Sequence, residues 1–277
     1  MTSRTMLTVA SGILAAAFLT GGASAQTKNL EAIATLKFYA AAEGNAFSVG
    51  TSPANVVFDG RSIWVANGPS RSVTKLRASD GAKLGTFATP DFAPNLAFDG
   101  ANIWVPNPHQ HSVTKLRASD GVTLGTFLVG LSPGGGLAFD GVNIWVANNT
   151  DGTVTKLRAS DGENLGTFPT GHGPRKIAFD GSSIWVTDSF SNTVTKLRAS
   201  DGLHQGTFLV GHGPVALAFD GVSMWVTNFT DNTVTRLRST DGLNMGTFPV
   251  GRGPNGMAFD GANIWVTNNA DSTVSKL

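Results

Sequence analysis

The sequence predicts an all-β fold, a six-bladed β-propeller with four antiparallel strands in each blade. Three observations lead there: a phrase that recurs six times, four β-rich runs in each repeat, and no sustained helical periodicity. The phrase first reads Phe-Asp-Gly-Arg-Ser-Ile-Trp-Val, over residues 58–65. The steps between its Trp residues are 40, 41, 40, 40 and 40 residues, for Trp64, Trp104, Trp145, Trp185, Trp225 and Trp265.

The strands can be followed in one repeat, residues 171–210. A short apolar run at 177–180 leads through an Asp-Gly turn to a second β-rich run at 184–187. After a polar stretch, residues 193–198 alternate, and a second Asp-Gly turn leads to a fourth run at 203–210. Runs rich in β-branched and aromatic residues, separated by Asp-Gly and Gly-Pro signals, predict a four-stranded antiparallel meander.

A four-stranded sheet cannot bury both faces alone, and packing copies around an axis solves this problem. The repeat breaks off at residues 274–277, in the third strand of the sixth blade, whereas residues 46–53 match the fourth-strand segment 207–214. We therefore expect residues 46–50 to close the ring as the outer strand of the Trp265 blade. The alternative is a longer propeller, because residues 33–37 resemble another third strand.

The first residues have the pattern of a secretory signal peptide. Arg4 precedes a largely apolar stretch over 6–19, and Ala23-Ser24-Ala25 is a small-residue cleavage site. We divide the chain into a signal peptide (1–25), an N-terminal lead-in (26–45) and the propeller (46–277). The lack of Cys favours a secreted or periplasmic bacterial protein that needs no disulfides. No second long apolar run follows, so we expect no membrane span.

Charge excludes some partners. Twenty basic and 19 acidic residues give a net charge of +1, which argues against nucleic acid. Most of these charges recur at fixed repeat positions, in the Lys-Leu-Arg segments and the Asp-Gly turns, which indicates structural roles. We expect a monomer without a cofactor, whose partner is a protein, a glycan or a small ligand.

The second strands read Trp-Val-Thr-Asn at 225–228 and 265–268, and the first strands follow Gly-x-Gly-Pro turns. This pattern resembles the YVTN-type propeller repeat, with Trp in place of Tyr, and more loosely the NHL propellers and virginiamycin B (streptogramin) lyase. The resemblance implies the propeller fold. For function the resemblance implies several classes, because such propellers include binding proteins, scaffolds and a few enzymes.

The lyase family places His directly after the loop Pro and Glu just past the second strand, where they work with Mg²⁺. This chain departs from that pattern, because neither residue type stands at those positions. The residues after the loop Pro are Ala54, Asn95, Gly134, Arg175, Val215 and Asn255. His172 and His212 lie two residues before a loop Pro, which leaves a shifted site open as an alternative.

Departures from the repeat gather in the loops before the first strand and after the second strand, which share one face of a propeller. There Arg175 and Lys176, with His172, His212 and Arg252, are candidates to line the mouth of the axis and hold an anion, and the alternative is that these loops are simply solvated. His109 and His111 also lie on this face and are candidate ligand-binding residues; the alternative is that they meet solvent, and we expect no metal there. The six Trp are expected in the core between blades rather than as sugar platforms.

Three functions remain at this point. The first is a secreted, non-enzymatic binding or scaffold protein with its ligand on the variable face. The second is a lyase or hydrolase that uses histidines near the axis as acid or base. The third is a structural or surface-layer module. We favour the binding protein and expect no catalytic residues.

Overall fold

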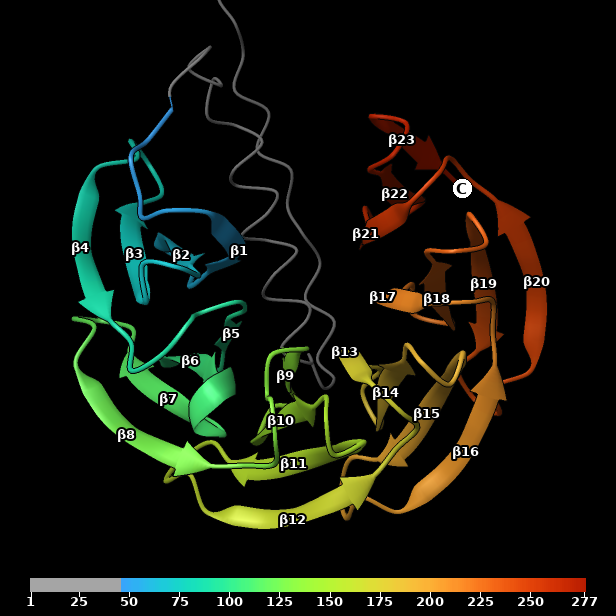
Figure 1. The fold of residues 1–277 in the computed structure, drawn as a ribbon, viewed down its shortest axis with the longest axis horizontal. Coiled ribbons are helices and arrows are strands. Elements are labelled where there is room, and N and C mark those ends of the chain that lie inside the picture. Colours follow the sequence, from blue (N-terminus) through green and yellow to red (C-terminus); the bar gives the residue numbers. More distant parts are fainter. Residues whose placement is uncertain (1–45) are drawn as a thin grey trace, which may run out of the picture.

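The computed structural model describes residues 46–277, which form six small antiparallel sheets around an axis (Figure 1). The all-β, six-bladed propeller is therefore confirmed. The predicted signal peptide (1–25) and lead-in (26–45) lie outside the described residues. Helix within residues 46–277 amounts to one 3-10 turn, Pro108–Gln110, and nothing there is a helix long and apolar enough to cross a membrane.

The first five blades each run from an inner strand near the axis to an outer strand at the rim, and the sixth has three strands (Figure 1). The first three blades are β1 (Pro53–Phe58), β2 (Ser62–Asn67), β3 (Ser72–Arg77) and β4 (Lys83–Ala88); β5 (Ala97–Phe98), β6 (Asn102–Asn107), β7 (Ser112–Arg117) and β8 (Thr123–Leu128); and β9 (Leu137–Phe139), β10 (Asn143–Asn148), β11 (Thr153–Arg158) and β12 (Asn164–Pro169). The next three are β13 (Pro174–Phe179), β14 (Ser183–Asp188), β15 (Thr193–Arg198) and β16 (His204–Leu209); β17 (Pro214–Phe219), β18 (Ser223–Asn228), β19 (Thr233–Arg238) and β20 (Asn244–Pro249); and β21 (Pro254–Phe259), β22 (Ile264–Asn268) and β23 (Thr273–Lys276).

The hydrophobic core lies between neighbouring blades. Trp145 of the third blade packs with Ile184 and Val186 of the fourth, and its ring centroid is 5.6 Å from that of Phe168. The same arrangement recurs at each of the five contacts between consecutive blades. The predicted role of Trp as core is thus confirmed for five residues, whereas Trp265 is 39% exposed.

The charges at fixed repeat positions hold these contacts together. Lys156 Nζ lies 5.2 Å from the centroid of the Trp145 ring and donates hydrogen bonds to the carbonyls of Ala199 (2.7 Å) and Ser200 (2.9 Å) in the next blade. Arg158 instead forms a surface ion pair with Asp161 in its own turn. The lysine therefore contributes both a cation–π contact and an inter-blade hydrogen bond, from a position with little exposure to water.

Ring closure by an N-terminal strand is not confirmed. Residues 46–50 form no strand, and β21–β22–β23 is a three-stranded sheet without an outer strand. The physical reason is that the first and sixth blades stand apart across an opening in the ring (Figure 1), so β23 lies out of reach of residues 46–50. Phe47 instead packs on Gly81 of the first blade, where an added Cβ would come within 2.1 Å of the phenyl ring.

Candidate functional site

One face of the ring, here called the variable face, is formed by the two sets of loops in which the repeats differ. The loop before an inner strand is tied to the loop after the second strand of the same blade by hydrogen bonds. For example, the backbone N–H of His172 donates to Ser191 Oγ (2.7 Å), and that of Leu131 donates to Asp151 Oδ2 (2.6 Å). This frame positions the side chains around the axis.

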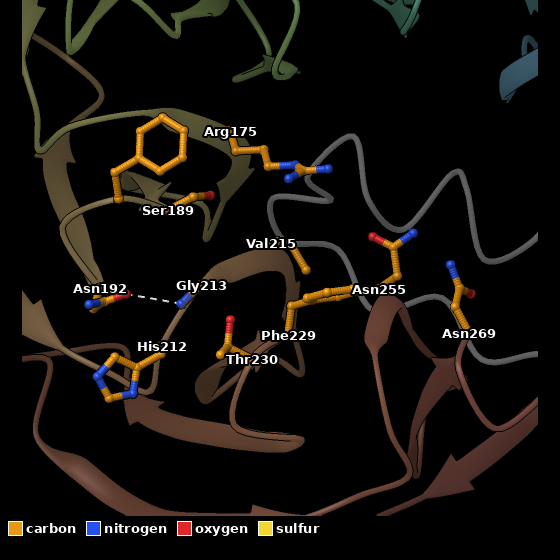
Figure 2. Close-up of a pocket in the computed structure, with 11 residues that line it drawn as sticks. Arg175, Ser189, Asn192, His212, Gly213, Val215, Phe229, Thr230, Asn255 and Asn269 are labelled. Atoms are coloured by element: carbon orange, nitrogen blue, oxygen red, sulfur yellow. Dashed lines mark hydrogen bonds between the residues drawn. The ribbon is translucent and has the colours of Figure 1, made fainter.

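The variable face contains a hollow of about 710 Å³ over the fourth, fifth and sixth blades (Figure 2). Three of its residues begin inner strands, and the others come from the loops around them. The lining consists of Arg175, Ser189, Phe190, Asn192, His212, Gly213, Val215, Phe229, Thr230, Asn255 and Asn269. A hollow of this size can hold a small molecule.

Arg175, Val215 and Asn255 occupy equivalent places, each directly after the Pro that starts an inner strand. In each strand the pairing register shifts just after that Pro, as in a β-bulge. A threonine of the second strand supports the irregular backbone; Thr187 Oγ1, for instance, accepts a hydrogen bond of 2.9 Å from the N–H of Lys176. Bulges redirect side chains, and this one presents the residue after Pro to the hollow.

Besides the hydroxyl of Thr230, three polar side chains of the hollow have no partner within residues 46–277. Neither the guanidinium of Arg175 nor the amides of Asn255 and Asn269 make a hydrogen bond or ion pair in this part of the chain. All three residues are exposed. In Figure 2, Arg175 extends towards the side of the hollow on which both asparagines lie. A cation and two amides are therefore available to a ligand.

Phe229 adds an apolar surface between these polar groups. At the same repeat position, Asn149 donates its amide to the Pro174 carbonyl (3.2 Å) and Ser189 donates its hydroxyl to the Pro214 carbonyl (2.6 Å). A phenyl ring cannot form that inter-blade link, and Phe229 remains 45% exposed at the hollow. The fifth blade thus replaces a structural hydrogen bond with an aromatic ring.

His212 lines the opposite side of the hollow in this view (Figure 2) and is paired with Asp231. The His212 Nδ1 lies 2.9 Å from Asp231 Oδ1, and its backbone N–H donates to Asp231 Oδ2 (2.7 Å). That backbone hydrogen bond and the His212 ring lower the pKa of the Asp231 carboxyl. The pair holds the loop and leaves Nε2 of the imidazole unengaged within the described residues.

The structure does not gather the predicted anion cluster. Arg252 forms an ion pair with Asp271 (Nε to Oδ1, 2.7 Å), and neither it nor His172 lines the hollow. Lys176 is half-buried on β13, and burial lowers the pKa of its ammonium group, but it too lies outside the lining. The hollow therefore takes Arg175 and His212 from the predicted set.

His109 and His111 turn to different partners. His109 Nδ1 lies 2.9 Å from Asp91 Oδ1. His111 adopts a left-handed backbone (φ 50°), and its Nδ1 accepts a hydrogen bond of 3.3 Å from the N–H of Ser132. Asn192 does the same for Gly213, so His111 has a loop-fixing role. No group of three potential metal-binding side chains occurs among residues 46–277.

Sequence reasoning missed Phe229, Asn255 and Asn269 as site residues. A signal existed for Phe229, because it stands where three other blades carry Asn or Ser. No such signal existed for Asn269. Asn149 is the same residue at the same repeat position, and its amide forms a structural hydrogen bond to the next blade. The Asn269 amide is available because the sixth blade has no following blade beside it among the described residues.

Comparison with solved structures gives several propellers. A streptogramin B lyase matches with a TM-score of 0.69 and 17% identity, over 84% of this chain and 84% of that chain. A catalytically inactive virginiamycin B lyase from Staphylococcus aureus, crystallised with quinupristin, matches with a TM-score of 0.72 and 16% identity, over 84% and 83%. A putative 6-phosphogluconolactonase from Bacteroides fragilis matches with a TM-score of 0.68 and 18% identity, over 83% and 81%.

No family model matches the chain, so the YVTN-type resemblance has no support beyond the residues that suggested it. No curated protein matches it in sequence either. At these identities the structural likenesses establish the propeller fold alone, because one fold supports many activities. The chemistry must be argued from the side chains of the hollow.

Proposed function

We propose that the protein is a secreted or periplasmic, non-enzymatic binding protein that holds a small anionic ligand in the hollow of the variable face. The observation that carries the proposal is the convergence of Arg175, Asn255 and Asn269, whose polar groups have no partner within residues 46–277, on one hollow. Their freedom distinguishes them from the paired charges of Arg252 and Asp271 nearby.

The three groups suit a ligand with an acidic group and hydroxyls. A guanidinium binds a carboxylate or phosphate through two parallel hydrogen bonds. Amides of Asn both donate to and accept from hydroxyl groups. The exposed ring of Phe229 offers an apolar face to the less polar side of the ligand. An acidic sugar combines these features.

The test is isothermal titration of the mature protein with glucuronate, inorganic phosphate and glucose as probes. We expect glucuronate to bind more tightly than glucose, and Arg175→Gln to weaken glucuronate binding by about tenfold or more, as loss of a charge-assisted pair predicts. Arg61→Gln is the matched control, since Arg61 lies in the turn between β1 and β2 at the opposite face. Equal affinity of wild type and Arg175→Gln for both anions would overturn the proposal.

A second candidate, an acid–base enzyme, rests on His212 and Asp231. A carboxylate on Nδ1 fixes the imidazole tautomer and leaves Nε2 to take or give a proton. The two groups lie 2.9 Å apart at the edge of the hollow. Against this role, Asp231 also accepts the His212 backbone N–H, and Arg252 and Asp271 repeat the arrangement without an imidazole. The shared geometry favours a loop-fixing pair.

A further inference from the structure

Five contacts between consecutive blades follow one rule. Each blade presents a donating wall, which in the first blade consists of Trp64, Val73, Lys75 and Phe87. The next blade packs against it with a receiving wall. In the second blade this wall consists of Leu96, Ile103, Leu116, Gly121 and the carbonyls of Ala118 and Ser119. The aromatic pairs of the five donating walls have nearly the same spacing, 5.5–5.6 Å between ring centroids.

Among residues 46–277, no donating wall lies against the receiving wall of the first blade. Val56 is 64% exposed, whereas the residues at its position in the next four blades are 4–7% exposed; they are Leu96, Leu137, Ile177 and Leu217. The carbonyls of Ala78 and Ser79 receive no lysine from within residues 46–277, unlike those of Ala118 and Ser119. Two members of this wall are covered: Leu76 is 8% exposed, and Gly81 has Phe47 packed on it.

Phe47 reproduces one part of the missing contact. An added Cβ on Gly81 would lie 2.1 Å from the Phe47 ring, and one on Gly121 would lie 2.0 Å from the ring of Phe87, the outer-strand phenylalanine of the preceding blade. If another blade preceded the first blade, its outer strand would contact the first blade in this way. Residues 46–50 therefore occupy the place of that outer strand. Their backbone pairs with no strand in the described structure.

The sixth blade shows the complementary deficit. Trp265 is 39% exposed and Val274 is 57% exposed, whereas the five valines equivalent to Val274 are fully buried; they are Val73, Val113, Val154, Val194 and Val234. Lys276 lies over the Trp265 ring at 5.4 Å, as its counterparts do over theirs. Within the described residues it has no carbonyl of a following blade to bind, and no strand pairs with the outer edge of β23.

We propose that the opening between the first and sixth blades is a seat for one further blade of the same repeat, whose outer strand is residues 46–50. Both walls are halves of a contact that the chain builds five times, so their complement is a blade carrying the same receiving and donating residues. Exposed apolar walls and an unpaired strand edge are features that proteins cover.

Two other ways of covering the walls fit less well. Direct contact between the first and sixth blades would require the five nearly identical contacts to change together, because at their present geometry the walls stand apart (Figure 1). A second copy of the chain is a whole ring, which is larger than the space between two single blades. A single blade keeps the geometry that the other contacts already have.

The experiment appends a copy of residues 158–197 after Leu277, which continues the repeat in register and supplies an outer strand for the sixth blade and three strands for the next. We expect the thermal midpoint to rise by at least about 5 °C and binding of a hydrophobic dye to fall, since both open walls become buried. Controls are a Gly-Ser extension of equal length and the same copy with its Trp185→Asp.

Phe47→Ala reports on the new blade specifically. It should lower the midpoint of the extended chain more than that of the original chain, because Phe47 would then belong to a complete blade. Absence of a gain over the Gly-Ser control, or rapid hydrogen exchange throughout the appended copy, would overturn the proposal. So would an original chain whose β23 amides are already protected, or one that forms a dimer dissociated by Trp265→Asp.

Discussion

The indole Nε1 of Trp145 donates a hydrogen bond of 2.8 Å to Oδ2 of Asp140. The other oxygen of Asp140 accepts the backbone N–H groups of Val142 (2.9 Å) and Asn143 (2.6 Å), which closes the turn between β9 and β10. One carboxylate thus joins a hairpin turn to the core between blades. The same bond, 2.7–2.8 Å long, occurs in all six blades.

Replacement of Trp145 by Ala should lower the free energy of unfolding by about 3–5 kcal/mol, because the ring is fully buried between two blades. Urea unfolding of a protein of residues 26–277 measures the loss. Trp265→Ala is the matched control and should cost clearly less, since that ring is more than one-third exposed. A Trp145→Ala protein of normal stability that has lost glycan binding would show instead that the ring is a ligand platform.

Asp188→Asn should stabilise the protein at neutral pH. Asp188 is buried where the other blades have Asn, and burial raises the pKa of its carboxyl above 3.8. The folded protein therefore holds this proton more tightly than the unfolded chain, and stability falls as pH rises from about 4 through the raised pKa. The Asn variant lacks this loss.

The expected gain at pH 7 is about 1 kcal/mol, or roughly 2–4 °C in the thermal midpoint, and it should vanish near pH 4. Thermal melts of both proteins across this pH range give the result. Asp161→Asn, at an exposed turn, is the control for loss of a carboxylate. A gain for Asp188→Asn that is the same at every pH would contradict the titration of Asp188.

Deletion of residues 26–50 should lower the thermal midpoint by roughly 3–6 °C, because it removes Phe47 from Gly81 and exposes more of the first blade. Deletion of residues 26–45 alone retains this contact and serves as the control. Equal midpoints for the two deletions would show that residues 46–50 contribute nothing to the ring.

A protein of residues 26–277 should neither linearise quinupristin nor respond to Mg²⁺. Removal of a proton requires a base at the reacting atom and a group that stabilises the developing negative charge. The residues after the loop Pro include no His, and within the hollow the one imidazole, His212, is held by Asp231. Chromatography of the antibiotic after incubation is the assay, and cleavage that His212→Ala abolishes would establish the enzyme.

The sequence predicted much of the fold and little of the site, for a physical reason. Arg252 and Arg175 look alike in the sequence, each in a Gly-Pro loop or next to it. The structure separates them, because Arg252 lies within reach of Asp271 and Arg175 has no carboxylate beside it in the described chain. An ion pair between two loops depends on how the blades place those loops in space. The spacing of the two residues along the chain does not reveal this placement.

By itself, the sequence determined the repeat, its four strands and the place of each tryptophan within its second strand, because each follows from local periodicity and from turns that Asp-Gly pairs form. The tertiary structure decided which of these equivalent residues remain unpartnered. Trp145 and Trp265 share one local sequence pattern, yet one is buried and the other exposed, because within residues 46–277 Trp145 has a following blade beside it and Trp265 has none. Whether a tryptophan is buried depends on the blade that packs against it, and the arrangement of the blades in the ring determines which blade that is.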